Sequence, residues 1–416
     1  MKSKLTSIAA SGLFATLAFA QPPHYKLTDL GPVGGTPGQP YFITSNGLVA
    51  GAAATADGRM HGVLWYKGQK RDIGTPGLGG PNSTAFGVNE RGQVVGEAQS
   101  SIPNGEDFCG FTSLGLPPSA TACLPFVWQN GMMTKLATLG GANGVANLNN
   151  SRGEVVGFAE TNTIDAACPG ISEFKPVVWA SGKIQELPTF PGDSDGGAFG
   201  INDNGQVVGS SGPCTPGFNP QSQVYFVPVH ALLWQNGAAT DLGNLGGDGG
   251  FAGNHACAIN NRGQVVGHSD LTDDATAHAF LWTRETRMSD LGTIPGDFAS
   301  FALGINDRGE VVGASVDANF NPRAFLWDNG AMVDINTLIP ANSGLSLQLA
   351  ESINSSGEIV GFGQTSTGEV HGFLATPATS GDDREDGLAA ARPGAPAIAS
   401  ERARKLLFQR LRIPAR

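Results

Sequence analysis

Four histidines first suggest chemistry, because histidine is the usual acid–base group near neutral pH and a common metal ligand. Each begins a short apolar segment of similar sequence, and other copies of that segment begin with leucine, lysine or arginine. The histidines are His61, His230, His278 and His371, and the other residues at this place are Leu124, Lys175 and Arg323. Because structural repeats hold such positions apart, we interpret the histidines as hydrogen-bonding or packing groups rather than catalytic ones.

Four aspartates form the second candidate group. Asp193, Asp248 and Asp297 each follow a glycine in three successive copies of one loop, and Asp195 completes the fragment "DSDG". Carboxylates that converge from neighbouring repeats would suit calcium, which prefers oxygen ligands. We therefore treat all four as ligand-binding candidates, with calcium at Asp193 and Asp195. The alternative is that they are ordinary solvated loop residues, since no complete EF-type loop follows.

Motifs that would identify a reaction are absent. The sequence contains no G-x-S-x-G, no H-E-x-x-H and no P-loop. A pair of carboxylates for glycoside chemistry cannot be identified without geometry. The catalytic residues, if there are any, are therefore unknown from the sequence.

The five cysteines indicate an oxidising compartment, where disulfides persist. Cys109 and Cys123 lie in one insertion and are expected to pair, and Cys168 and Cys214 lie in two successive insertions and could pair as well. Cys257 falls inside an apolar strand pattern and is expected to be a buried thiol outside any disulfide. No C-x-x-C pair is present, which argues against a zinc site.

The N-terminus has the pattern of a secretory signal. Lys2 and Lys4 precede an apolar run, and Ala18-Phe19-Ala20 gives a cleavage site before Gln21. We expect residues 1–20 to be removed and the protein to be exported to the periplasm or beyond. No later apolar run is long enough for a membrane helix. The formal net charge of −11 disfavours nucleic acid as a partner and leaves glycans or proteins as candidates.

Seven copies of one repeat dominate the sequence, and the nonamer "INDNGQVVG" (201–209) is a typical copy. Each copy also contains an aromatic segment such as "HAFLW" and a "DLG" segment. The copies of the Val-Val-Gly element end at Gly51, Gly96, Gly157, Gly209, Gly267, Gly313 and Gly361. The spacing varies from 45 to 61 residues, so the repeat is one structural unit with loops of variable length.

Each unit holds four short segments that read as strands. Four strands per unit and seven units predict an all-β seven-bladed β-propeller over residues 21–376. A β-solenoid, or a propeller of six or eight blades, is the alternative. The chain starts with a "DLG" strand and ends with an aromatic strand, so we expect residues 26–31 to complete the last blade and close the ring.

The lengths of the connections between strands predict which face of the disc carries the function. The Asn-x-x-Gly turn and the turn after the aromatic strand are short, and both should lie on one face. The longer connections should lie on the other face, and they are longest at 97–123, 158–174 and 210–229. Because long loops on a rigid scaffold usually carry the function, we expect binding on that face, near units two to four.

Residues 377–416 are expected to be a disordered tail with a basic, amphipathic end, "RARKLLFQRLRIPAR". A helix that docks on the protein or on a membrane surface is the alternative for that end.

The segments "HAFLW" (278–282), "DLGT" (290–293) and "INDRGEVVG" (305–313) resemble those of bacterial extracellular HAF-repeat proteins. The resemblance covers about residues 21–376, although "LPFVW", "KPVVW" and "HGFLA" lack part of the motif. It implies an exported repeat protein of undefined role and brings no catalytic residues.

Three functions remain open from the sequence. The favoured one is a binding or interaction module that uses the variable-loop face. A polysaccharide hydrolase or lyase on a propeller scaffold is second, and a structural surface protein is third. Only an enzyme would turn over a glycan.

Overall fold

The structure is a computed structural model. It describes residues 24–31, 35, 37–75, 77–105, 108–111, 116–214, 227–378 and 397–411. The expected signal segment 1–20 lies outside these residues, so its removal stays a prediction. Within the described part of the chain, no helix is both long and apolar enough to cross a membrane.

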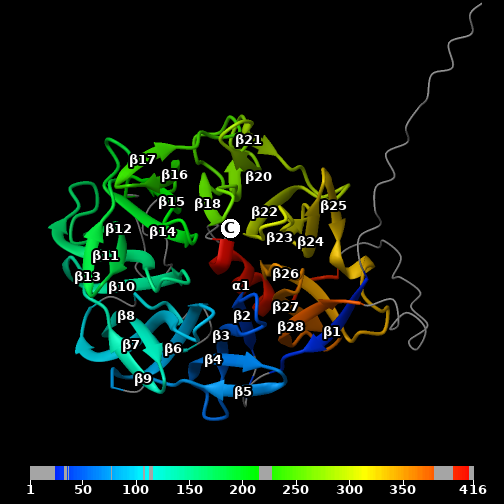
Figure 1. The fold of residues 1–416 in the computed structure, drawn as a ribbon, viewed down its shortest axis with the longest axis horizontal. Coiled ribbons are helices and arrows are strands. Elements are labelled where there is room, and N and C mark those ends of the chain that lie inside the picture. Colours follow the sequence, from blue (N-terminus) through cyan, green and yellow to red (C-terminus); the bar gives the residue numbers. More distant parts are fainter. Residues whose placement is uncertain are drawn as a thin grey trace, which may run out of the picture.

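Seven four-stranded antiparallel sheets stand around a central axis, as predicted (Figure 1). In blades one to six the strands follow chain order from the axis outward. Blade one holds β2 (Gly38–Ile43), β3 (Val49–Ala54), β4 (Met60–Tyr66) and β5 (Gln69–Asp72). Blade two holds β6 (Gly79–Val88), β7 (Val94–Pro103), β8 (Thr121–Gln129) and β9 (Met132–Lys135). Blade three holds β10 (Gly140–Asn149), β11 (Val155–Ile164), β12 (Ser172–Ala180) and β13 (Lys183–Glu186).

Blade four holds β14 (Asp195–Ile201), β15 (Val207–Gly212), β16 (His230–Gln235) and β17 (Ala238–Asp241). Blade five holds β18 (His255–Ile259), β19 (Val265–Asp270), β20 (Ala277–Thr283) and β21 (Arg287–Asp290). Blade six holds β22 (Ala299–Ile305), β23 (Val311–Val316), β24 (Pro322–Asp328) and β25 (Ala331–Asp334), followed by the short helix η3 (Ile335–Thr337). Blade seven holds β26 (Leu345–Ile353), β27 (Ile359–Thr365), β28 (Val370–Pro377) and β1 (Tyr25–Asp29).

The ring closes in blade seven, where the first strand of the chain pairs with the last. β1 runs antiparallel to β28, with Tyr25 opposite Pro377 and Asp29 opposite Phe373. This pairing gives β28 a hydrogen-bonded partner on its outer side and joins the two ends of the chain. The predicted closure is confirmed.

The Asn-x-x-Gly turns have the expected local structure. In blade four the amide of Gly205 donates to the Asn202 carbonyl (3.1 Å), and Gly205 adopts a left-handed φ of 76°. The side-chain oxygen of Asn202 accepts from the amides of Asn204 and Gln206, at 3.0 Å each. The turn chemistry read from the sequence is therefore confirmed.

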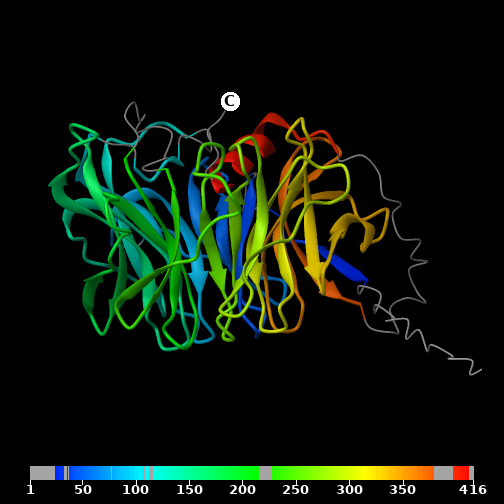
Figure 2. The same cartoon turned by 90° about the horizontal axis from the view of Figure 1, so that it is seen from above.

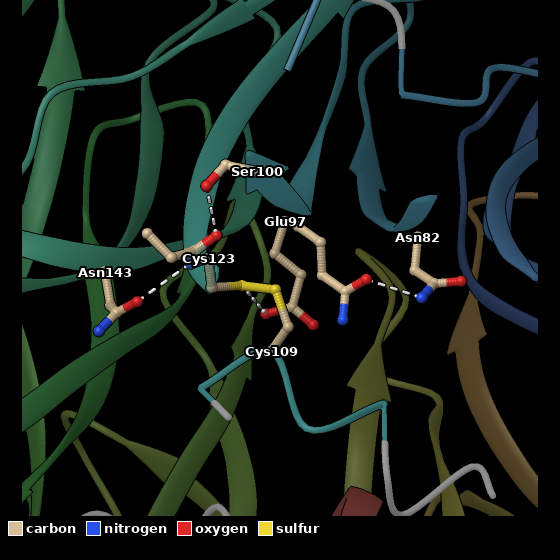
Figure 3. The surroundings of a disulfide bond; sticks show 8 residues. Asn82, Glu97, Ser100, Cys109, Cys123 and Asn143 are labelled. Carbon is tan, nitrogen blue, oxygen red and sulfur yellow. Dashed lines mark hydrogen bonds between the residues drawn. A yellow bond between two sulfur atoms is a disulfide. The ribbon is translucent and has the colours of Figure 1, made fainter. Parts of the chain in front are cut away.

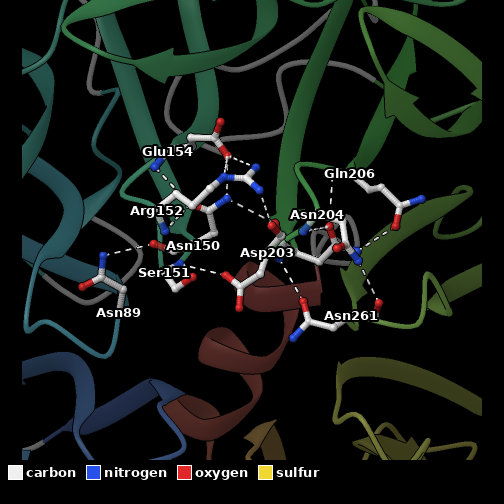
Figure 4. A network of polar contacts seen from close by, with 10 residues as sticks. Asn89, Asn150, Ser151, Arg152, Glu154, Asp203, Asn204, Gln206 and Asn261 are labelled. Atoms are coloured by element: carbon white, nitrogen blue, oxygen red, sulfur yellow. Dashed lines mark hydrogen bonds and ion pairs between the residues drawn. The ribbon is translucent and has the colours of Figure 1, made fainter.

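The same asparagines also link neighbouring blades, which the sequence did not indicate (Figure 4). Each side-chain amide donates to the backbone carbonyl of the corresponding residue in the next blade, at 2.9–3.2 Å. The links run from Asn89 to Asn150, Asn202, Asn260, Asn306, Asn354 and finally Thr44.

The seventh link differs, because Thr44 has no amide group to donate. At that junction the Glu90 carboxylate of blade two accepts from the backbone amides of Ser45 (2.7 Å) and Asn46 (3.3 Å). The tight-turn face therefore carries a closed circle of inter-blade hydrogen bonds. We call this circle the asparagine ring.

The expected disordered tail is a helix over part of its length. Helix α1 (Glu401–Leu411) lies at the axis on the variable-loop face, opposite the asparagine ring (Figures 1 and 2). Leu406, Leu407 and Leu411 are buried against Phe301 and Leu349 of the inner strands. The prediction of disorder was wrong for residues 397–411 because the apolar side of this helix finds a matching surface in the channel. The composition of the segment did not show that surface.

We predict that Asn202→Asp destabilises the protein. The new side chain keeps the acceptor oxygen but loses the donor to the Asn260 carbonyl, which keeps only its bond from the Gly263 amide, and a carboxylate oxygen then faces that carbonyl. The expected loss is about 1–3 kcal/mol in the free energy of unfolding, measured by urea denaturation. The control Asn236→Asp changes an exposed asparagine in an outer turn and should change stability by less than about 0.5 kcal/mol. Equal losses in the two variants would contradict the role of the ring.

Candidate functional site

Every inner strand carries a β-bulge three residues before the turn residue. In blade four, for example, Ala198 pairs with Gly209 and Gly200 pairs with Val208, so Phe199 is the extra residue. Bulges commonly re-aim a side chain near a working site. The seven bulged residues all line one cavity on the axis, and they are Tyr41, Phe86, Asn147, Phe199, Cys257, Leu303 and Glu351. We call this set the bulge ring.

The glycine of each Val-Val-Gly element makes the bulge possible. A Cβ atom on Gly209 would lie 2.0 Å from the Gly197 carbonyl oxygen, and one on Gly267 would lie 1.8 Å from that of His255. Real Cβ atoms do not come this close to a backbone oxygen, so only glycine fits opposite the bulged strand. The repeated glycine thus accommodates the strand that directs a side chain into the channel.

The cavity has a volume of about 280 Å³, and phenylalanine and tyrosine rings form part of its wall. The rings of Tyr41 and Phe86 pack with centroids 5.3 Å apart, and Phe158 and Phe199 meet edge to face at 6.5 Å. Phe108 reaches the same cavity from the long insertion of blade two. This wall suits the flat apolar part of a small molecule.

Polar groups occupy the other parts of the wall. His255 bonds the Ser210 hydroxyl through Nδ1 (2.8 Å), and His268 lies beside it, with ring centroids 5.1 Å apart. Cys257, from the bulge ring, has its sulfur 4.0 Å from His268 Nδ1. Cys257 was expected to be buried inside a strand. It is instead half-buried, because the bulge turns it toward the cavity, and it forms no disulfide.

Helix α1 contributes the wall on the variable-loop side. The Arg410 Nε donates to Glu351 Oε2 at 2.7 Å, and its guanidinium carbon lies 5.7 Å from the centre of the Tyr41 ring. The Glu351 side chain is 1% exposed. Burial raises the pKa of Glu351, and the Arg410 charge opposes that rise. Arg410 therefore balances a carboxylate that would otherwise be costly inside the channel.

A smaller hollow of about 170 Å³ lies at the opposite end of the channel, inside the asparagine ring. Both hollows share a belt of apolar residues from the ends of the inner strands. The belt consists of Phe42, Leu148, Ile201, Ile259, Ile305 and Ile353. The channel thus changes from aromatic to apolar to polar along its axis.

The four histidines of the sequence analysis do not meet. His61, His278 and His371 each pair through Nδ1 with the aspartate of the adjacent "DLG" strand, at 2.8, 2.9 and 2.7 Å. His230 pairs with Asp193 instead, at 2.9 Å. In three pairs the histidine and the aspartate lie on neighbouring strands of one blade. In the fourth, Asp193 lies just before the first strand of the blade that contains His230. The interpretation as hydrogen-bonding groups is consistent with this geometry.

The predicted aspartates are not brought together either. Asp297 forms a buried ion pair with Arg323 (2.5 Å), and Asp193 accepts from His230 and the Ser211 hydroxyl. Asp248 is exposed at the surface of blade five. Each of these carboxylates therefore has a local environment that accounts for its position. Their role in ligand binding stays a prediction.

Asp195 differs from the other three because it is buried at the start of an inner strand. Its carboxylate accepts from the Phe174 amide (2.7 Å) and from the Ser194 hydroxyl (3.1 Å). Burial raises the pKa of Asp195 to about 7, and the nearby Asp165 adds to the rise. Asp193 faces His230 of blade four, while Asp195 faces residues of blade three. Calcium at Asp193 and Asp195 also stays a prediction.

The expected disulfide and the pairing that the sequence left open are both present. Cys109 joins Cys123 within the insertion of blade two, with the buried Glu97 beside the bridge (Figure 3), and Cys168 joins Cys214 between blades three and four. Each bridge lies near a buried carboxylate, Glu97 or Asp165, in an arrangement that superficially resembles a metal site. Bridged sulfurs are not thiolates and are poor metal ligands. The bridges instead fasten the long loops to the sheets.

We predict a pH-dependent cost of burying Asp195. Its pKa is higher in the folded than in the unfolded state, so the folded state holds the proton more tightly. The wild type should therefore lose stability relative to Asp195→Asn as pH rises from about 4 to about 7, by about 2–4 kcal/mol in all. Urea denaturation at several pH values measures this difference. Asp328→Asn, at an exposed position, should parallel the wild type, and an Asp195→Asn curve parallel to both would contradict the prediction.

Comparisons with known proteins support the fold and leave the ligand open. Residues 192–371 match the model of a family described as "Protein of unknown function (DUF3466)". No curated protein matches the chain. Three solved structures are similar to the chain at low identity, and they are a puromycin-hydrolyzing peptidase of Mycobacterium tuberculosis, TolB of Acinetobacter baumannii and the Aleuria aurantia lectin.

The peptidase is 12% identical, with a TM-score of 0.50, over 87% of this chain and 56% of its own. TolB is 13% identical, with a TM-score of 0.35, over 61% and 53%. The lectin is 9% identical, with a TM-score of 0.34, over 80% and 89%. The chain spans about half the length of the peptidase and of TolB. The likeness to the peptidase shows that this chain is similar to it in propeller fold alone.

Proposed function

We propose that this protein is an exported binding module, of the HAF-repeat type, that takes a small ligand into the central cavity from the variable-loop face. The bulge ring is the observation that carries the proposal. The residues around the bulges are alike from blade to blade, whereas the bulged residues differ in size, charge and polarity. A repeat kept only for architecture would not need a different side chain at the bulged position, which faces the channel.

The surroundings of the cavity support entry from the variable-loop face. Phe108 comes from the insertion of blade two, which the Cys109–Cys123 bridge fixes in place. Leu406 and Leu411 of α1 line the other side of the same end. A loop fixed by a disulfide and a docked helix would hold the cavity in shape before a ligand binds, so they suit a preformed site. The cavity volume is near the lower end of the range for small-molecule sites, about 300–1,000 Å³.

We predict that a neutral apolar fluorophore, N-phenyl-1-naphthylamine, binds the full chain saturably. Its fluorescence should rise because the cavity excludes water. Phe86→Ala should weaken binding about tenfold, or about 1.4 kcal/mol, since it removes one aromatic face. Met132→Ala is the matched control, because Met132 is 70% exposed on an outer hairpin.

A fluorescence rise that is not saturable, or that is the same in Phe86→Ala as in the wild type, would remove the cavity as the binding site. The hydrolase or lyase alternative is tested separately with a set of glycans. Turnover that is lost on changing Asp193, Asp195, Asp248 and Asp297 would favour the enzyme. Saturable binding without turnover would favour the binding module.

A further inference from the structure

Two buried aspartates meet where blade three joins blade four, away from the central cavity. Asp165 directly follows β11 in the long loop of blade three, and Asp195 is the first residue of β14; each is 2% exposed. Burial raises the pKa of Asp195 to about 7, and contact with Asp165 adds to the rise. Buried charges in proteins are normally paired with an opposite charge or bound to a metal ion.

One oxygen of Asp165 has no hydrogen-bond donor among the described residues. Its Oδ1 accepts from the Ala167 amide at 2.6 Å, whereas its Oδ2 is buried without a hydrogen-bond partner. The Ser194 hydroxyl lies beside both carboxylates, but its single proton is donated to Asp195 Oδ2, at 3.1 Å. A buried oxygen without a donor is costly, so Asp165 Oδ2 needs a partner of another kind.

No side-chain cation supplies that partner in the described part of the chain. The Lys175 ammonium bonds the Ser194 carbonyl and pairs with Glu173 at 3.0 Å rather than with either aspartate. No other lysine, arginine or histidine that the structure describes forms an ion pair with Asp165 or Asp195. Two carboxyl groups in contact then hold either a shared proton or a bound cation between them.

The surroundings favour a cation, because a third oxygen is held in a fixed position beside the two carboxylates. The Ser194 hydroxyl accepts from the Cys214 amide at 3.2 Å, and an Asp165 oxygen lies within 4.8 Å of both sulfurs of the Cys168–Cys214 bridge. The bridge therefore keeps the loop of Asp165 against Ser194 and Asp195. Since bridged sulfurs are poor ligands, the donors here are oxygens alone, the set that calcium prefers.

We propose that Asp165, Asp195 and the Ser194 hydroxyl bind a calcium ion at the junction of blades three and four. Asp193 is not part of this site, because its carboxylate pairs with His230 and the Ser211 hydroxyl. A calcium ion here ties the long loop of blade three to the first strand of blade four. The site is separate from the central cavity, so it stands or falls independently of the proposed function.

Calcium titrated into the full chain, first stripped with a chelator, tests the site by calorimetry near neutral pH. The wild type should bind calcium with a Kd below about 1 mM, and Asp165→Asn should weaken binding at least about tenfold. Asp328→Asn, at an exposed position, is the matched control and should bind as the wild type does. Absence of calcium binding to the wild type would overturn the proposal and leave a shared proton. Loss of binding in Asp193→Asn but not in Asp165→Asn would overturn it as well.

A second measurement on the wild type locates the ion without any variant. The Cys168–Cys214 bridge is buried, so a reductant reaches it only when the loop opens, and a bound calcium ion opposes that opening. Calcium should slow reduction of this bridge by dithiothreitol at least about threefold, followed by alkylation and mass spectrometry. Reduction of Cys109–Cys123, the internal control, should not change. An equal effect on both bridges, or no effect on either, would overturn the site, whether or not Asp165→Asn folds.

Discussion

The hydrogen bond from each asparagine side chain to the carbonyl of the next blade is the interaction on which the rest of this structure depends. One side-chain oxygen fixes the local turn, and the amide group of the same residue links that turn to its neighbour. Six such links and the Glu90 junction close a circle at one end of the channel. Because the inner strands all begin or end at this circle, their positions around the axis are fixed together, and so is the cavity that they enclose.

The bulge and the glycine opposite it form a second constraint that depends on the first. Each inner strand gains one residue before its turn, and the neighbouring strand makes room by giving up its side chain. The side chain of this extra residue faces the axis and does not have to pack between blades. The protein can therefore vary Phe199, Cys257 and Glu351 without changing the scaffold around them.

The variable-loop face is stabilised less by the repeated strands and turns than by elements outside the repeat. The Cys109–Cys123 and Cys168–Cys214 bridges fasten two of the insertions, and α1 closes part of the axis by burying leucines and pairing Arg410 with Glu351. Such an ion pair adds little net stability, but removing Arg410 would be costly because it would leave the buried Glu351 carboxylate without its counter-charge. Such a pair thus favours one position of the helix over others. The asymmetry of the molecule is concentrated at this end.

The sequence by itself favoured seven blades, the four-strand unit, the closure by β1 and β28, the turn chemistry and the Cys109–Cys123 pairing, and it left the Cys168–Cys214 pairing open. These follow from local patterns, since strand alternation, turn residues and repeat phase are written over a few neighbouring positions. Only the tertiary structure decided which strand is innermost, that Phe199 and its counterparts are bulged, and that Arg410 meets Glu351 across 59 residues of chain. The sequence placed the candidate site on loop aspartates, whereas the cavity is lined by the bulge ring together with the apolar belt, Phe108 and α1. The lining residues come together only when seven segments that are distant in sequence surround a common axis. No pattern within a single repeat therefore predicts the cavity.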